Sequence, residues 1–171
     1  IVKVRQMPGT ASATSGSTSV TRTREDFLVQ HVGMKVYIDG VDEGTIASRV
    51  AGTKATITLT STGAFANNET VVIGSKTYTF KAALTPAANE VLVGASATES
   101  HRNLKAAVNI ESGAGTLYGA ATTQNADVEC TSATATTNVL SARYTGTDGN
   151  ALASTETCAN ASFPGATFNS G

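Results

Sequence analysis

The sequence predicts a mainly β protein with one helix. Its parts are a small antiparallel β-barrel-like N-terminal module and an α+β module in which one helix lies across an antiparallel sheet. Three observations lead to this fold class. Apolar and polar residues alternate over short runs that glycine-containing turns separate, which is typical of half-buried strands. A single stretch combines helical spacing with an N-terminal capping box. Only 15% of the 171 residues are charged and 5% are aromatic, so Thr, Ser, Ala and Gly fill the strands and turns.

Residues 1–19 are expected to form an N-terminal arm and a connector. The opening IVKVRQMP alternates apolar and basic residues, and a run rich in Gly, Ser and Thr follows it. An extended apolar arm can add a strand to the edge of a neighbouring sheet. The alternative is that this segment is the first strand of its own module. The candidate inter-chain contacts are Ile1, Val2, Lys3, Val4 and Arg5.

Residues 20–62 are expected to form the barrel-like module. Every second residue of GMKVYID is apolar, and the turns DGVDEG and AGTK flank a second strand, TIASRV. A further strand comes from SVTRT. The last strand, ATITLT, points its threonines outward and turns inward Ala55, Ile57 and Leu59. Short antiparallel strands at this spacing are typical of a small barrel or a curled sheet.

Residues 68–171 are expected to form the α+β module, after a boundary between residues 60 and 70. Two runs at 71–73 and 77–80 flank GSK, a compact hairpin signal. Another strand is expected around 91–93, and three more in DVECTSA, NVLSARYTG and STETCAN.

The one substantial helix is expected at about residues 96–111. Ser96 and Glu99 form a capping box, in which the serine oxygen accepts from a free amide and the glutamate reaches back. Gly113 or Gly115 would end the helix. Spacings of four, three and four residues place on one face Ala97, His101, Leu104 and Val108.

Charge and hydropathy exclude two classes of partner. The net charge is −1 and the basic residues are scattered, which argues against a nucleic-acid partner. No apolar run approaches the roughly 20 residues of a membrane-spanning helix, so we expect no membrane partner. The opening IVKVRQMPG also lacks the pattern of a signal peptide.

The residues capable of chemistry do not form a recognisable motif. We find no nucleophile elbow, phosphate loop or metal-binding histidine pair, so we expect no enzymatic activity, no cofactor and no metal. His31 and His101 lack ligand spacing, and His101 is expected to be a packed helix residue. Cys130 and Cys158 could form a disulfide or remain buried thiols.

Two acidic turns could in principle hold a hard cation. They are DGVDEG, with Asp39, Asp42 and Glu43, and GTDGN, with Asp148 and Asn150. Neither has the spacing of a complete calcium loop, so we interpret both as solvated turns.

Each module contains a set of segments that matches a known kind of protein. In the first module these are SGSTSVTRTREDFL, VGMKVYIDG and GTIASRVAGTKATITLTS, with departures at RTRED and at Met34. The second set is longer and consists of VVIGSKTYTFKAALTPAANEVLVGASATESHRNLKAAVN, GTLYGAATTQNADVE, TGTDGNALASTET and ASFPGATFNSG. On these segments both modules resemble virion proteins of tailed bacteriophages. Together the two resemblances cover about nine-tenths of the chain, as expected for two small domains.

The resemblance implies a structural component of a tailed-phage virion, namely a capsid decoration or cement protein that acts through protein–protein contacts. The alternative is a collar, neck or tail-fibre accessory or adhesion module that binds another virion protein or a host-surface glycan. The implied partners are major capsid, portal, neck or tail proteins and further copies of the chain. The implied location is the virion, assembled in the cytoplasm of the bacterial host.

Overall fold

The computed structural model describes residues 52–171 in full and, before them, the backbone of four short strands. These strands are β1 (Ala11–Ala13), β2 (Val20–Arg22), β3 (Lys35–Ile38) and β4 (Val41–Thr45). β1 pairs with β2 and β3 pairs with β4, both antiparallel, in two separate two-stranded sheets. The predicted joining of these strands into one barrel-like sheet is therefore wrong for the described residues.

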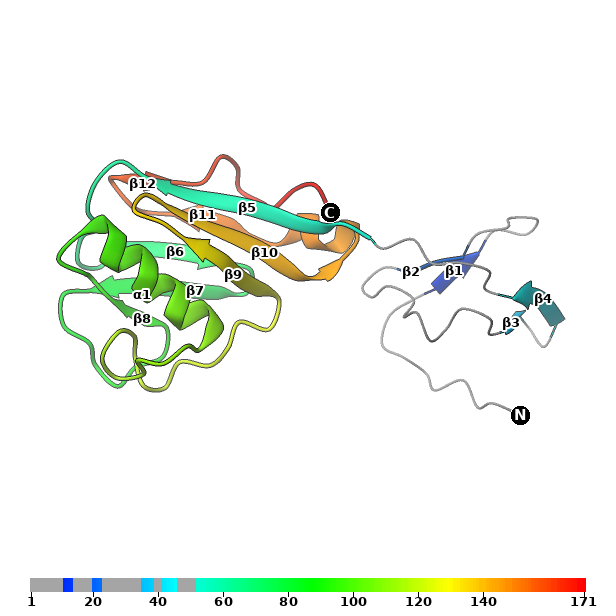
Figure 1. Cartoon of the computed structure of the whole chain (residues 1–171), viewed down its shortest axis with the longest axis horizontal. Coiled ribbons are helices and arrows are strands. Elements are labelled where there is room, and N and C mark those ends of the chain that lie inside the picture. The colour runs from blue at the N-terminus through cyan, green and yellow to red at the C-terminus, as the bar shows by residue number, and fades with distance from the viewer. Residues whose placement is uncertain (1–10, 14–19, 23–34, 39–40, 46–51) are drawn as a thin grey trace.

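The rest of the chain contains two four-stranded sheets and one α-helix. Their orders are β12–β5–β10–β9 and β11–β6–β7–β8. Figure 1 shows the two sheets as layers, with α1 along one side. The bounds are β5 (Lys54–Ser61), β6 (Thr70–Ile73), β7 (Lys76–Lys81), β8 (Glu90–Leu92), α1 (Ala97–Asn109), β9 (Val128–Ala133), β10 (Thr137–Thr145), the 3-10 helix η2 (Thr147–Ala151), β11 (Ser154–Glu156) and β12 (Ala161–Ser162).

Strand β5 has the predicted alternation, and Ala55, Ile57 and Leu59 are buried as expected. Its partners, however, are β10 and β12, so the prediction that it pairs with the N-terminal strands is wrong. Alternation determines which face of a strand is buried, but not which strand lies beside it. β10 continues the buried face of β5, because its buried Leu140 lies directly opposite Ile57.

The second sheet begins with the predicted hairpin, β6–β7, whose turn contains Gly74 at φ +61°. β8 then runs parallel to β7, so this sheet is mixed, and the prediction of a single antiparallel sheet is wrong. The connection of residues 82–89 brings the chain back before β8 starts. The buried carboxylate of Glu90 fixes this loop by accepting bonds from the main-chain N–H and the hydroxyl of Thr85, at 2.6 and 3.0 Å.

Helix α1 begins with the predicted cap. The Ser96 hydroxyl accepts from the Glu99 N–H at 3.2 Å, and the Glu99 carboxylate accepts from the Ala95 N–H at 2.7 Å. The helix ends earlier than the glycine signals suggest, because Ile110 takes the left-handed conformation at φ +56°. The chain beyond it is held in place by the Tyr118 hydroxyl, which donates to the Glu111 carbonyl at 2.5 Å.

One core joins the two sheets and the helix. α1 lies against the edge strands β8 and β9, and three of its four predicted face residues, His101, Leu104 and Val108, are fully buried. On the opposite side, residues near the C-terminus bridge the sheets, because Asn169 pairs with Thr56 of β5 and Thr167 with Ala153 beside β11. Within the described part of the chain, α1 and η2 are both too short and too polar to cross a bilayer.

Candidate contact surface

The outer face of the β12–β5–β10–β9 sheet carries a group of threonines. Residues that alternate with the buried side chains of β5 point away from the core, and Thr137 of β10 lies directly opposite Thr60. β-branched side chains suit such a pleated surface, and each hydroxyl can both donate and accept a hydrogen bond. We call this surface the threonine face and define it by Thr56, Thr58, Thr60 and Thr137.

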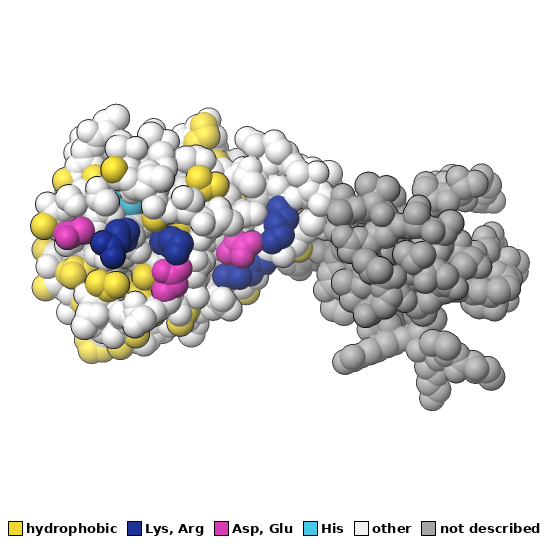
Figure 2. All heavy atoms as spheres, viewed as in Figure 1, with side chains coloured by type: hydrophobic (Ala, Val, Ile, Leu, Met, Phe, Trp, Pro, Cys, Tyr) yellow, Lys and Arg dark blue, Asp and Glu magenta, His cyan; other side chains and the backbone are white. Residues whose placement is uncertain are grey.

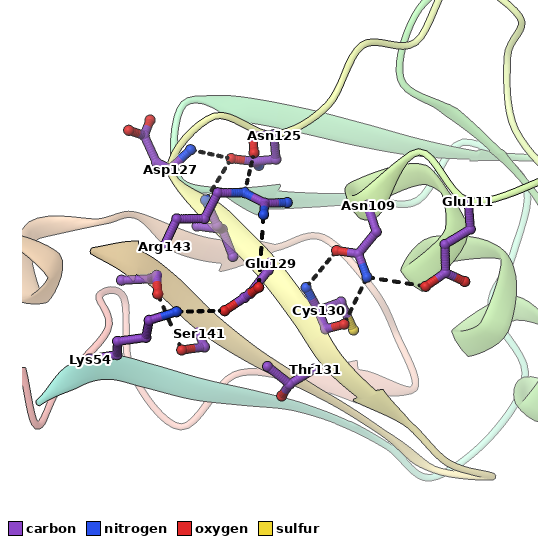
Figure 3. Close-up of polar contacts among 12 residues, drawn as sticks. Lys54, Asn109, Glu111, Asn125, Asp127, Glu129, Cys130, Thr131, Ser141 and Arg143 are labelled. Carbon is purple, nitrogen blue, oxygen red and sulfur yellow. Dashed lines mark hydrogen bonds and ion pairs between the residues drawn. The ribbon is translucent and has the colours of Figure 1, made fainter. Parts of the chain in front are cut away.

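Three charged side chains lie on the same outer face (Figure 3). Lys54 Nζ is 2.8 Å from Glu129 Oε1, and Arg143 Nη1 is 3.8 Å from Glu129 Oε2. The Lys54–Glu129 pair crosses β10 at Ser141, which is only 6% exposed. We call Lys54, Glu129 and Arg143 the Glu129 cluster. Its side chains are 27–40% exposed, so water and salt weaken their attraction.

Arg143 also ties the cluster to the loop before β9. Its Nε donates to the Asn125 carbonyl at 2.8 Å, and its main-chain N–H donates to the Asp127 carbonyl at 2.8 Å. Asn125 is fully buried, and its side-chain oxygen accepts from the main-chain N–H groups of Asp127 and Val128. These contacts fix the start of β9 and therefore the position of Glu129.

A row of charged side chains continues from the β9–β10 end of the sheet over α1 (Figure 2). Lys105 Nζ lies 2.5 Å from Glu111 Oε1, so the Lys105 hydrogen bond holds the pKa of the Glu111 carboxyl below its usual value. A groove of about 800 Å³ follows this helix, and its lining combines Leu92 and Leu117 with charged side chains such as Arg102. The surface thus combines matched charges, hydroxyls and small apolar areas, which suits protein contact.

Ser61, His101 and Asn138 form a buried hydrogen-bonded series. Nε2 of His101 lies 2.7 Å from the Ser61 hydroxyl and Nδ1 lies 2.5 Å from Asn138 Oδ1. The amide oxygen only accepts, so Nδ1 carries the proton and Nε2 accepts from Ser61. Burial lowers the pKa of His101. The order hydroxyl, imidazole, amide is that of a nucleophile, a base and an orienting group. Here, however, the three residues are at most 3% exposed and lie in the core, with Phe65 and the imidazole ring packed edge to face.

Sequence reasoning found His101 but missed both of its partners. The alternation of inward and outward positions along the two strands could have identified these partners. Ser61 follows the inward positions of β5, and Asn138 precedes the inward Leu140 of β10. A polar residue at an inward strand position requires a buried partner.

Both cysteines are free thiols. The Cys130 thiol lies 3.3 Å from the Ser132 carbonyl, and the Cys158 thiol lies 3.6 Å from the Thr70 carbonyl. Burial raises the pKa of Cys130 to about 11 and the pKa of Cys158 to about 12. Neither thiol therefore carries appreciable thiolate at neutral pH, which is the form that reacts.

The remaining predicted site residues fall in several places. Ile1, Val2, Lys3, Val4 and Arg5 lie outside the described residues, as do His31 and Asp39. Asp42 and Glu43 lie in β4. Asp148 and Asn150 lie in η2, where Asn150 Oδ1 accepts from the Gly171 N–H at 2.9 Å. In the part of the chain that the structure describes, no three His, Cys, Asp or Glu side chains are grouped in a way that could hold a metal ion.

No protein-family model, curated protein or solved structure matches this chain.

Proposed function

We propose that this protein is a structural component of a tailed-phage virion and that it decorates or cements the capsid through protein–protein contacts. The sequence resemblance described above motivates the virion assignment. The threonine face is the structural observation that carries the contact role. It lies on a well-packed sheet, so the backbone that carries its side chains is fixed before a partner arrives, and preorganisation reduces the cost of binding.

The neighbouring Glu129 cluster makes one end of this surface chemically different from the other. Lys54 and Arg143 lie at one end of the sheet, while the threonines extend along β5 to Thr60. Charged groups at the rim of an interface chiefly set orientation and association rate, and the central contacts provide most of the affinity. The proposed partners are major capsid subunits and further copies of this chain.

Immunogold labelling of purified virions tests the proposed location. An antibody against residues 52–171 should label the whole head surface if the protein decorates the capsid. Label at the neck or tail would instead support the collar and tail-fibre alternative. Purified virions without the protein would overturn the proposal.

Substitution of the threonine face tests the proposed contact. Thr60→Arg places a long charged side chain on the exposed surface and should lower occupancy on particles about tenfold, since an unmatched interface charge costs more than about 1 kcal/mol. Thr98→Arg is the matched control, because Thr98 is also exposed but lies on α1. Equal occupancy of both variants on the particle would contradict a role for this face.

A further inference from the structure

The buried network of Ser61, His101 and Asn138 lies on the inner side of one end of the threonine face. Ser61 follows Thr60 at the end of β5, and Asn138 follows Thr137 at the start of β10. Thr60 and Thr137 are opposite each other in the ladder, and successive side chains of a strand point to opposite faces of a sheet. The outward threonine pair and the two inward partners of His101 therefore belong to the same two strand ends.

One imidazole ring connects both strand ends to α1. Nε2 of His101 accepts from the Ser61 hydroxyl at 2.7 Å, and Nδ1 donates to Asn138 Oδ1 at 2.5 Å. The Asn138 amide is oriented independently, because its Nδ2 donates to the His101 carbonyl at 2.9 Å. The main chain joins the same strand ends, since the Ser61 N–H donates to the Thr136 carbonyl at 2.8 Å. The direction of the Ser61 side-chain bond thus depends on the protonation state of the ring.

Protonation of His101 reverses the bond to Ser61. A histidine cation donates from both ring nitrogens, whereas a neutral ring accepts at one of them. The Ser61 hydroxyl must then accept from Nε2 and turn its own hydrogen away. In the described part of the chain this hydroxyl bonds to the imidazole alone, and a buried donor without an acceptor costs free energy. The cation therefore favours a second arrangement of the end of β5.

Among the described residues, the interior around the ring offers no charge that balances a cation. Phe65 and the imidazole pack edge to face, and the Cys130 thiol lies 3.4 Å from Asn138 Nδ2. Burial raises the pKa of that thiol to about 11, so it is neutral in mildly acidic solution. Burial also lowers the pKa of His101, so the ring stays neutral until the pH falls below 6.5.

The charged groups of the surrounding elements are engaged elsewhere or lie at the surface. Those of β5, β9 and β10 form the Glu129 cluster on the outer face of the sheet. The others are Glu99, Arg102 and Lys105 of α1 and Glu69 of the loop before β6. Both glutamates accept from main-chain N–H groups, Lys105 pairs with Glu111, and Arg102 is exposed. No ion pair therefore offsets a charge on the His101 ring.

We propose that His101 is a pH-sensitive switch for the threonine face, and that the Thr60 and Thr137 end of this face loosens when the ring gains a proton. Strand ends open more easily than strand centres, and Ser61 is the last residue of β5. A loosened end is less preorganised, so it should bind a partner more weakly. The effect on binding rests on the proposed function, whereas the loosening concerns this chain alone.

NMR of the full chain tests the loosening. Between about pH 8 and about pH 5 the His101 ring signals should titrate, and the amide signals of Ser61 and Asn138 should shift with the same midpoint. Relaxation dispersion should detect exchange on the μs–ms timescale at these two amides in acid but not at neutral pH, and at neither pH at Thr79 of the other sheet. His31→Gln removes the only other histidine and should give the same result.

His101→Gln is the variant that cannot titrate. Its amide can still accept from the Ser61 hydroxyl, so the acid-dependent shift and exchange at Ser61 should be absent. If this variant does not fold, the shared midpoint and the dispersion in the parent protein decide. The inference is overturned by a ring that stays neutral down to about pH 5, by a ring that titrates without exchange at Ser61, or by equal exchange at Thr79.

Binding to purified particles tests the consequence. Occupancy of the parent protein should fall about tenfold from pH 8 to pH 5, and occupancy of His101→Gln should change less than about twofold. An equal dependence on pH for the two proteins would overturn the role of His101 in binding. Failure of both proteins to bind at either pH would contradict the proposed function, and the NMR measurements would still decide whether the switch exists.

Discussion

Ser61, His101 and Asn138 form a polar network inside the protein, whereas Lys54, Glu129 and Arg143 form one on the outer face of the same sheet. The inner network is uncharged and almost completely buried. The outer one is ionic and 27–40% exposed. Water can replace a lost partner on the surface, but not in the core. The comparison teaches that burial, more than formal charge, sets what each network contributes to stability.

The largest effect is expected for Asn138→Ala. Asn138 accepts from His101 Nδ1 and donates to the His101 carbonyl at 2.9 Å. Removal of its amide leaves both groups unpaired and opens a cavity, so the free energy of unfolding should fall by about 3 kcal/mol. Urea denaturation at neutral pH measures this change.

Asn160→Ala is the control for that prediction. Asn160 is exposed and donates to the Ala64 carbonyl at 3.2 Å, so its loss should cost less than about 1 kcal/mol. Similar losses for the two variants would contradict the role assigned to burial.

The second-largest effect is expected at acid pH, which should weaken the inner network. Burial lowers the pKa of His101 below its usual 6.5, so the folded state favours the neutral ring. This contribution is complete above pH 6.5 and is lost as the pH falls from there toward the folded-state pKa. The loss should be smaller than in Asn138→Ala, because both nitrogens of a protonated ring still have acceptors in Ser61 and Asn138.

The measurement is the free energy of unfolding from about pH 8 to about pH 5, a range that brackets the usual pKa of histidine. In His101→Gln, the part of the fall in unfolding free energy that protonation of His101 causes should be absent. A parent profile that is flat over this range would contradict the prediction.

Arg143→Met should have an intermediate effect. The change removes the bond from Nε to the Asn125 carbonyl and the contact with Glu129, but the methionine retains most of the packing of the aliphatic stem. A loss of about 1–2 kcal/mol is expected in urea denaturation. Arg102→Met, an exposed position on α1, should change stability by less than about 0.5 kcal/mol.

Lys54→Met should have the smallest effect. It breaks an ion pair between two side chains that are 40% and 33% exposed, for which about 0.5 kcal/mol is expected. The difference from the parent protein should disappear near 1 M salt, where screening acts over about 3 Å. A difference that persists undiminished in high salt would indicate that the pair acts through packing over Ser141.

Local signals in the sequence predicted local structure well. The Ser96 and Glu99 pair located the start of α1, and alternation identified β5 and its buried face. In both cases the determining contacts lie within a few residues, so they can be read without knowledge of the fold. The hairpin around Gly74 was found for the same reason.

Long-range pairing could not be read in this way. The residues of β10 that pair with β5 lie about eighty positions further along the chain, and alternating patterns of this kind fit many partners. The parallel direction of β8 follows from the course of residues 82–89, a loop that the Glu90 contacts hold and that has no sequence signature. The bonds from the Asn109 side chain to the Cys130 main chain likewise join two elements whose contact only the fold creates.

The end of α1 shows a local signal that tertiary contacts override. Gly113 and Gly115 both have positive φ, yet Ile110 takes the left-handed conformation first. A β-branched residue is unfavourable in that conformation. The cost is offset by contacts on either side, since Asn109 binds Cys130 and Tyr118 binds the Glu111 carbonyl.

The bridge between β5 and Asn169 has a practical consequence. Thr56 and Asn169 exchange both main-chain bonds, at 2.9 and 3.2 Å, so the entry to β5 and the segment around Asn169 lie side by side (Figure 1). A short peptide can join these two points with little loop-closure entropy. A chain joined in this way and reopened in the exposed β9–β10 turn, as a circular permutant, is expected to keep the two sheets and α1.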